Sequence, residues 1–190
     1  MKDIIYRRIE EHKTAVDNIL KDSRVVDIIT EMAEEIVNSL KEGGQLFICG
    51  NGGSAADSQH LATELISKFY RERKAINAEA LSVNTSTITA IGNDYSFDNV
   101  FSRQLEAKGR YNDILLGIST SGNSKNVLMA MREAKRKGLK CFAFTGANIC
   151  ELDNVCDVIL HVPSYDTPRI QEIHILAGHI MCELIEEAML

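Results

Sequence analysis

Residues 46–65 read LFICGNGGSAADSQHLATEL, which is an apolar run, a glycine turn and a polar stretch in direct succession. The apolar run predicts a buried strand, and the residues that follow the turn predict a helix. Glycines let the backbone approach a ligand closely, and the free N–H groups of a helix's first turn favour an anion such as phosphate. His60 and Glu64 are four residues apart, so they share one face of this helix. The stretch therefore predicts a binding turn followed by two titratable side chains.

The same order of elements occurs again at residues 113–137. Residues 113–118 form a continuous apolar run of the kind that is buried on both faces in parallel sheets. The turn STSGNS follows at 119–124, and a helix is predicted over 126–137. Further strands are predicted near 79–83, 140–145 and 157–162, so strands and helices alternate along the chain. This alternation predicts an α/β fold with a parallel, five-stranded sheet between two layers of helices, and ligands bind such sheets beyond the carboxyl ends of the strands.

Two helices precede the first predicted strand, over residues 4–20 and 25–41, and Gly43 and Gly44 end the second. This pair either covers the sheet or packs against another copy of the chain. Further along, the pattern predicts a helix from the cap Asn84 to Ile91, a turn at 92–94, one helix over 97–108, and a long C-terminal helix from Pro168. The length of 190 residues favours a single domain, 1–190, made of a helical pair, 1–42, and an α/β core, 43–190.

Composition excludes several classes of partner. The net charge is −6, and no cluster of basic residues is large enough to indicate nucleic-acid binding. No apolar run approaches the ~20 residues that a membrane-spanning helix needs, so we expect no membrane association. The five cysteines are odd in number and include no C-x-x-C pair, which is typical of a reducing compartment. We therefore expect a cytoplasmic location.

The turn at 119–124 has four hydroxyl side chains in six residues. It is interpreted as a phosphate cradle, made of hydroxyls and backbone N–H groups at a helix N-terminus. The alternative is ordinary helix capping, which also favours serine and threonine. The Gly-Lys-Ser/Thr ending of a nucleotide-binding P-loop is absent, and residues 50–54 do not form a dinucleotide-binding G-x-G-x-x-G turn. ATP and NAD are therefore disfavoured as ligands.

His60 and Glu64 in isolation would fit an exposed ion pair, but the C-terminal helix carries further polar groups among apolar residues. Polar groups on such a helix need partners. Gln171 and His179 are eight residues apart, hence about 80° apart around the helix axis and about 12 Å along it. They can serve one site by leaning together, or they belong to sites shared by two copies of the chain. His174 is aligned with neither, and we interpret it as a structural histidine.

Four separated motifs carry a resemblance: residues 50–54 with His60 and Glu64, residues 90–94, residues 117–124, and residues 169–172 with His179. Together they resemble the sugar-isomerase (SIS) superfamily over nearly the full chain. The resemblance is closest to members that convert D-sedoheptulose 7-phosphate to D-glycero-D-manno-heptose 7-phosphate through an enediol, the first step toward nucleotide-activated heptose for surface glycans. It implies a homotetramer with active sites between subunits, in which the N-terminal helical pair helps build the assembly.

The resemblance also implies roles for individual residues. Glu64 would be the catalytic base and His179 the catalytic acid. Zinc, one ion per subunit, would be bound by His60, Glu64, Gln171 and His179. The phosphate would be held by Ser119, Thr120, Ser121 and Ser124. The sugar would be lined by Asn51, Gly52, Gly53, Ser54, Glu64, Asn93, Asp94 and Gln171.

Two alternatives within the superfamily remain open. One is a non-catalytic SIS protein that binds a phosphosugar or a replication initiator, and the other is an isomerase that acts on a different sugar phosphate. Aldose–ketose isomerisation needs a carboxylate near the reacting carbons and a proton donor at the carbonyl oxygen. The presence of both Glu64 and His179 favours the enzyme over the binding protein.

Overall fold

Five parallel strands form one sheet in the order β2-β1-β3-β4-β5 in the computed structural model, which describes residues 1–190. This confirms the expected parallel, five-stranded sheet. The strands are β1 (Leu46–Gly50), β2 (Ala78–Ala80), β3 (Ile114–Ile118), β4 (Lys140–Thr145) and β5 (Val158–His161). In the register of the two central strands, Leu46 of β1 is the partner of Ile114 of β3, and Gly50 is the partner of Ile118. The carboxyl ends of β1 and β3 are therefore level with each other.

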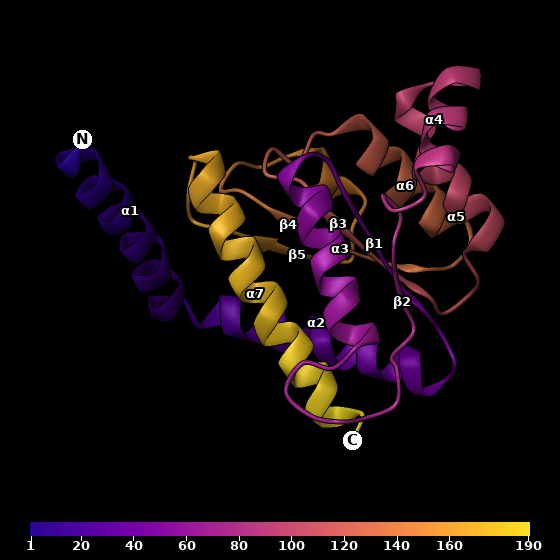
Figure 1. Ribbon diagram of the computed structural model, residues 1–190, viewed down its shortest axis with the longest axis horizontal. Helices are drawn as coiled ribbons and strands as arrows, with labels where there is room; N and C mark the ends of the chain where they lie inside the picture. Colours follow the sequence, from indigo (N-terminus) through magenta and orange to yellow (C-terminus); the bar gives the residue numbers. More distant parts are fainter.

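Helices cover both faces of the sheet and make three layers (Figure 1). Side chains alternate along β1, so that Leu46 and Ile48 belong to one buried cluster while Phe47 and Cys49 belong to the other. Helices α2, α3 and α7 pack on the first face, and α5 and α6 pack on the second. The helices are α1 (Lys2–Lys21), α2 (Ser23–Lys41), α3 (Gly53–Ile66), α4 (Thr85–Asp94), α5 (Ser102–Lys108), α6 (Lys125–Arg136) and α7 (Thr167–Ala188), with 3-10 turns η1 (Phe97–Asn99) and η2 (Glu151–Asn154).

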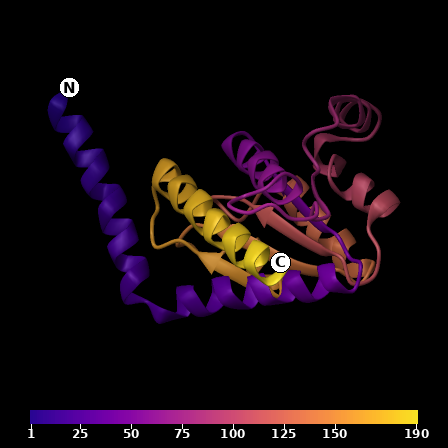
Figure 2. The same cartoon turned by 60° about the horizontal axis from the view of Figure 1, so that its bottom comes forward.

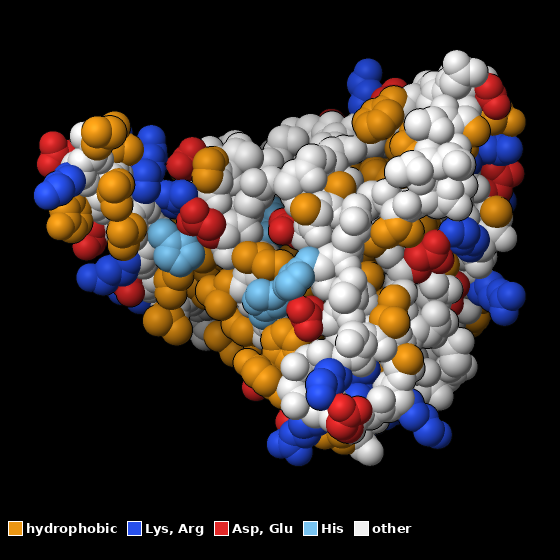
Figure 3. All heavy atoms as spheres, in the orientation of Figure 1, with side chains coloured by type: hydrophobic (Ala, Val, Ile, Leu, Met, Phe, Trp, Pro, Cys, Tyr) orange, Lys and Arg blue, Asp and Glu red, His pale blue; other side chains and the backbone are white.

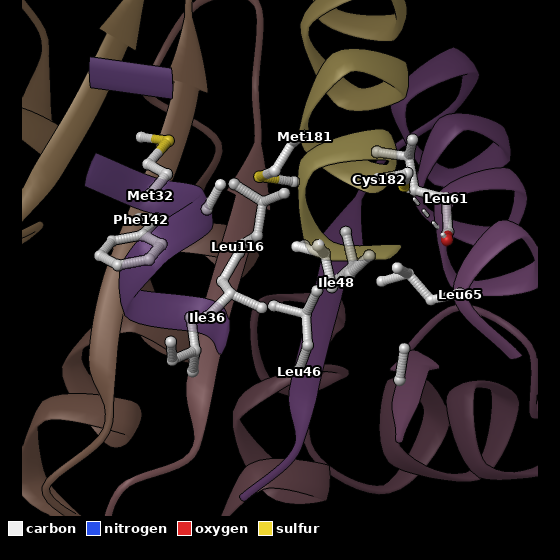
Figure 4. Packing of buried hydrophobic residues seen from close by; sticks show 14 of the residues in the cluster. Met32, Ile36, Leu46, Ile48, Leu61, Leu65, Leu116, Phe142, Met181 and Cys182 are labelled. Atoms are coloured by element: carbon white, nitrogen blue, oxygen red, sulfur yellow. Dashed lines mark hydrogen bonds between the residues drawn. The ribbon is translucent and has the colours of Figure 1, made fainter. Parts of the chain in front are cut away.

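The larger buried cluster ties α3 and α7 to the sheet and to α2 (Figure 4). Met32 and Ile36 of α2 reach the sheet, and Met181 of α7 lies in the same cluster. The thiol of Cys182 donates a weak hydrogen bond to the carbonyl oxygen of Leu61, 3.9 Å away, which places α7 directly against α3. Because buried side chains pack closely with few voids, this cluster fixes the two helices relative to each other.

The two N-terminal helices behave differently. Helix α2 buries seven residues and covers the sheet, which confirms one of the two roles expected for the helical pair. Helix α1 buries only Ala15 and stands away from the body of the molecule (Figure 2). Its apolar residues Ile4, Ile5 and Ile9 are each more than half exposed. Within one chain, α1 therefore leaves a hydrophobic face without a partner.

Three local predictions are wrong in detail. The expected turn at 92–94 lies inside α4, which continues to Asp94, because Gly92 does not take the positive φ that a glycine turn would use. The single helix expected over 97–108 is divided into η1 and α5, with Phe101 buried between them. The second strand is shorter than expected and ends at Ala80. The N-cap expected at Asn84 is confirmed, since its side chain accepts a 3.0 Å hydrogen bond from the N–H of Thr87. No helix is both long and apolar enough to cross a membrane.

Candidate active site

The two turns singled out in the sequence lie side by side at the carboxyl edge of the sheet. From β1 the chain continues to β2 on one side of the sheet, whereas from β3 it continues to β4 on the other side. The direction of strand order therefore reverses between β1 and β3. Such a switch point is where open α/β sheets bind ligands. The amides of Asn51, in the first turn, and Asn126, in α6, exchange two hydrogen bonds of 2.8 Å. Asn126 was not singled out from the sequence, where it is simply one polar residue in the first turn of a helix.

The glycine turn is built for close packing and a sharp change of direction. A Cβ at Gly50 would lie 2.7 Å from the Ser54 side chain and 2.9 Å from the carbonyl oxygen of Ile118, so only glycine fits there. Gly52 has φ +58°, the left-handed region that glycine adopts without strain, and it precedes the first residue of α3. No side chain caps α3. The first N–H groups of this helix therefore have no side-chain acceptor.

The serine turn closes on itself through hydroxyl groups. The Oγ atoms of Ser119 and Ser124 are 3.0 Å apart, and the N–H of Gly122 donates to Ser119 Oγ over 3.2 Å. Ser124 is the N-cap residue of α6, yet its side chain makes no capping hydrogen bond. The hydroxyl is therefore directed toward Ser119, which differs from the capping that was the alternative interpretation. Hydroxyls and a helix N-terminus converge here, as an anion site requires.

Two imidazoles and a carboxylate meet where α3 packs against α7. The Nε2 atoms of His60 and His179 are 2.8 Å apart, and Glu64 Oε1 lies 3.4 Å from His60 Nε2. The Phe69 ring lies 5.8 Å from the His179 ring. Figure 3 shows histidine side chains together at the surface of this face. A hydrogen bond between two imidazole nitrogens needs one donor and one acceptor, so the pair shares a proton between α3 and α7.

Asp57 is a further titratable group in this region. It lies one turn before His60 on α3, and its Oδ2 atom is buried without a hydrogen-bond partner. Burial raises the pKa of Asp57, while the nearby charges of His60 and His179 act in the opposite direction. The sequence contains a pattern that could have identified Asp57. Asp57, His60 and Glu64 follow one another at spacings of three and four residues, so they share one helix face. Only the packing of α7 shows that this face is partly buried.

Gln171 and His179 both face α3 of their own chain. A Cβ at Gly53 would lie 2.7 Å from Gln171 Nε2, so the Gln171 amide lies against the first turn of α3, whereas His179 lies against His60 two turns further along. The two side chains of α7 are thus spread along α3. Asn93 and Asp94 stand apart from this cluster: the Asn93 amide donates a 2.9 Å hydrogen bond to Asp94, and both residues are exposed at the end of α4.

His174 has the structural role that the sequence indicated. Its ring is buried, and Nε2 lies 3.1 Å from the carbonyl oxygen of Thr145, to which it donates. Burial lowers the pKa of His174 to about 4, although the hydrogen bond to Thr145 acts in the opposite direction. The ring is therefore neutral near pH 7 and lies against Phe144, with the ring centroids 5.6 Å apart.

The donor types expected for zinc are chemically suitable, because two imidazoles, a carboxylate and an amide oxygen can all bind this ion. The positions of these side chains do not yet form a zinc site. No three His, Cys, Asp or Glu side chains are arranged as a metal-binding group. The facing Nε2 atoms of His60 and His179 are 2.8 Å apart, whereas two nitrogens bound to one tetrahedral zinc ion would be about 3.3 Å apart. A small separation of the two rings would bring them to that spacing.

This fold and these two turns define the class of SIS domain proteins, and a family model described as SIS domain matches residues 11–146. Proteins named phosphoheptose isomerase are similar over their full lengths. One from Clostridium acetobutylicum is 49% identical over 189 residues, which cover 100% of this chain and 96% of the relative. Another, from Aneurinibacillus thermoaerophilus, is 43% identical over 189 residues, covering 100% of this chain and 96% of that relative.

Solved structures give the same result. A phosphoheptose isomerase from Neisseria gonorrhoeae has a TM-score of 0.92 and 40% identity, with 98% of each chain covered. One from Francisella tularensis has a TM-score of 0.94 and 37% identity, with 97% of each chain covered. The chain belongs to the SIS domain family, and the relatives that it matches over their full lengths are phosphoheptose isomerases.

Proposed function

We propose that this protein is an aldose–ketose isomerase that converts D-sedoheptulose 7-phosphate to D-glycero-D-manno-heptose 7-phosphate, the first step toward nucleotide-activated heptose. The observation that carries the proposal is the His60–His179 contact with Glu64 beside it, on the helix that begins at the glycine turn. A general base and a general acid are the groups that this reaction needs. The full-length similarity to phosphoheptose isomerases supports the same substrate.

In this proposal the serine turn holds the phosphate through the hydroxyls of Ser119, Thr120, Ser121 and Ser124 and the first N–H groups of α6. The sugar chain then extends toward α3 and meets the glycine turn. The sugar is lined by Asn51, Gly52, Gly53, Ser54, Glu64, Asn93, Asp94 and Gln171. The Asn51–Asn126 amide pair supports this placement, because it joins the two turns that would hold the two ends of the substrate.

In the proposed proton transfer, one helix supplies the base and the other supplies the acid. Glu64 takes a proton from C1 of the ketose while His179 donates a proton to the oxygen on C2, and an enediol results. Return of a proton to C2, with loss of the proton on the C1 oxygen, gives the aldose. The 2.8 Å contact between the two imidazoles places the His179 ring beside α3, on the same side as Glu64. General acid–base groups of this kind typically contribute on the order of 10²–10⁴-fold each to a rate.

A bound zinc ion is part of the proposal, with His60, Glu64, Gln171 and His179 as ligands. The side chains of His60, Glu64 and His179 lie together, whereas Gln171 lies against Gly53 and would have to move along α3 to join them. When bound, it would polarise the substrate carbonyl as a Lewis acid. Metal analysis of protein purified without chelator should find about one zinc ion per chain. Treatment with a chelator should remove both the metal and the activity, and zinc should restore the activity. Full activity in protein shown to be free of metal would exclude an essential ion.

We also propose that the chain is one SIS domain, 1–190, that assembles as a homotetramer with active sites between subunits. Two observations support a partner subunit. The N-terminal helix of the 1–42 pair exposes Ile4, Ile5 and Ile9, and an apolar face of this kind marks an interaction surface. Asn93 and Asp94 lie exposed at the end of α4, and their side chains hydrogen-bond only to each other, so they are free to complete a neighbouring site. Light scattering coupled to gel filtration should give four times the mass of one chain.

The central test uses purified protein and sedoheptulose 7-phosphate. Wild-type protein should form the aldoheptose phosphate, whereas Glu64→Gln and His179→Gln should reduce kcat by at least about 100-fold. Both variants should keep the mass of the assembly and the affinity for inorganic phosphate, because the serine turn is untouched. Full activity of either variant would remove that residue from the acid–base assignment. Turnover of a different sugar phosphate in preference to the heptulose phosphate would change the proposed substrate.

A further inference from the structure

A buried ion pair joins α7 to the segment that follows α3. Arg73 Nε lies 3.1 Å from Glu186 Oε1, and the two side chains are only 2% and 1% exposed. Glu186 also accepts three backbone hydrogen bonds, from the N–H groups of Phe69 (2.9 Å), Tyr70 (2.7 Å) and Arg71 (3.0 Å). The carboxylate thus receives four donors, which is the arrangement that a buried charge requires.

Arg73 also binds the end of α3. Its Nη2 atom donates to the carbonyl oxygen of Glu64 over 2.9 Å, and its Nη1 atom donates to that of Leu65 over 2.7 Å. The last carbonyl groups of a helix have no partners within the helix, so a guanidinium group can satisfy them. Arg73 therefore holds the helix turn that carries Glu64. Figure 1 shows the connection from α3 to β2 passing the C-terminal end of α7.

The other half of the ion pair is on the helix that carries His179. Glu186 follows His179 by seven residues, which is close to two helical turns, so both project from the same side of α7. The segment that Glu186 binds includes Phe69, whose ring lies 5.8 Å from the ring of His179. One ion pair is thus connected to the backbone of Glu64 on one side and to the packing of His179 on the other.

The Glu186 carboxylate is held in its charged form. Burial by itself would raise the pKa of Glu186, but the three N–H donors and the charge of Arg73 outweigh it and lower that pKa. Removing one partner of such a pair leaves a buried charge without compensation, whereas an exposed pair contributes little. The chain contains an exposed pair for comparison, because Arg71 contacts Glu187 over 3.1 Å with side chains that are 60% and 51% exposed.

We propose that Arg73 and Glu186 are positioning residues, whose buried ion pair fixes the turn of α3 that carries Glu64 against the face of α7 that carries His179. Neither residue touches the substrate. The proposal rests on the proposed isomerase function for its kinetic readout, and on geometry alone for its structural readout.

The test compares Arg73→Lys with Arg71→Lys. Lysine at position 73 keeps the charge that Glu186 needs but lacks the fork that reaches the carbonyl groups of Glu64 and Leu65. We expect kcat to fall on the order of 10- to 100-fold, because a displacement of about 1 Å at a reacting group has an effect of this size. KM and inhibition by inorganic phosphate should change less than about threefold, since the serine turn follows the carboxyl end of β3 whereas Arg73 precedes the amino end of β2. Arg71→Lys should stay within about twofold of wild type.

A second variant and a crystal structure separate positioning from simple destabilisation. Glu186→Gln should reduce kcat in the same way, at a temperature where circular dichroism shows it to be folded, with Glu187→Gln as its control. In the crystal structure of Arg73→Lys, the end of α3 and the Phe69 ring should be displaced from His179. A folded Arg73→Lys variant with wild-type kcat would overturn the proposal, and so would unchanged positions of Glu64 and Phe69 in its crystal structure. If wild-type protein does not isomerise the heptulose phosphate, the proposed function fails, and the crystal structure still decides the positioning role.

Discussion

Replacing Gly53 by alanine adds a single methyl group, and it should reduce isomerase activity without reducing the stability of the fold. Gly53 is the first residue of α3, and its φ lies outside the left-handed region, so alanine can adopt its backbone conformation. The new Cβ would lie 2.7 Å from Gln171 Nε2, whereas ordinary contact begins at 3.4 Å, so the Gln171 amide must retreat by 0.7 Å or more (3.4 − 2.7). The amide is the end of a flexible side chain and can rotate away. Gly53→Ala should therefore fold and lose the placement of Gln171.

The expected size of the two effects follows from these distances. A displacement of about 1 Å in a substrate-binding group reduces kcat/KM on the order of tenfold or more. Replacing glycine by alanine in a helix stabilises it by up to about 1 kcal/mol, so Tm should be unchanged or raised by about 2–4 °C. Isomerase activity and thermal unfolding are measured on the same preparation. Ala56→Gly is the control, since it is exposed in the same helix turn and should lose about 0.5–1 kcal/mol of stability while keeping its activity. If folded Gly53→Ala keeps kcat/KM within about twofold of wild type, Gln171 is not a binding group.

Two further predictions concern stability. Gly122→Ala should reduce the free energy of unfolding by about 2–3 kcal/mol, because Gly122 has φ +65° and a Cβ there would lie 2.1 Å from Cys150 Sγ and 2.5 Å from Cys150 Cβ. Urea unfolding measures the loss, and a wild-type midpoint would refute the argument. Cys150→Ala in the same chain removes Sγ but keeps Cβ, so it should recover only the part of the loss that is caused by the sulfur. The pKa of His174 is about 4 in the folded chain, where the ring is buried, and 6.5 in the unfolded chain. As the pH falls below 6.5, the unfolded chain therefore binds a proton that the folded chain does not bind, and the protein loses stability until the pH reaches about 4. Urea unfolding should show that wild type loses about 2 kcal/mol more between pH 7 and pH 5 than His174→Gln does, and equal losses in the two proteins would contradict the role of this ring.

Much of the fold could be predicted because local pattern and tertiary packing agree. The apolar runs at β1 and β3 are followed by glycine-bearing turns and helices, and each of these elements is present in the structure. The errors have two different causes. Phe101 is buried between η1 and α5 and interrupts a periodic stretch that otherwise fits one helix. The segment 92–94 contains turn-forming residues, yet Gly92 does not adopt a positive φ, and the N–H of Tyr95 donates to the carbonyl oxygen of Ile91, so the segment completes a helical turn.

The candidate site could be predicted only in part. Neighbours along one helix, such as His60 and Glu64, follow from a spacing of four residues. The eight-residue spacing of Gln171 and His179 left two arrangements open, and the structure shows both side chains against α3 of the same chain. Arg73 and Glu186 could not be paired from the sequence, because they are far apart in the chain and each alone fits an ordinary surface charge. Their burial depends on how α7 lies across the end of α3.

The sequence by itself determined the order of strands and helices and the two turns at the carboxyl edge of the sheet, because glycine geometry and hydrophobic periodicity act over a few residues. It also placed His60 and Glu64 on one helix face. Only the tertiary structure decided which groups meet across helices: the facing imidazoles of His60 and His179, the buried oxygen of Asp57, and the Arg73–Glu186 ion pair. These contacts depend on the packing of α7 against α3, which the large hydrophobic cluster beneath them fixes and which no short segment of the sequence specifies.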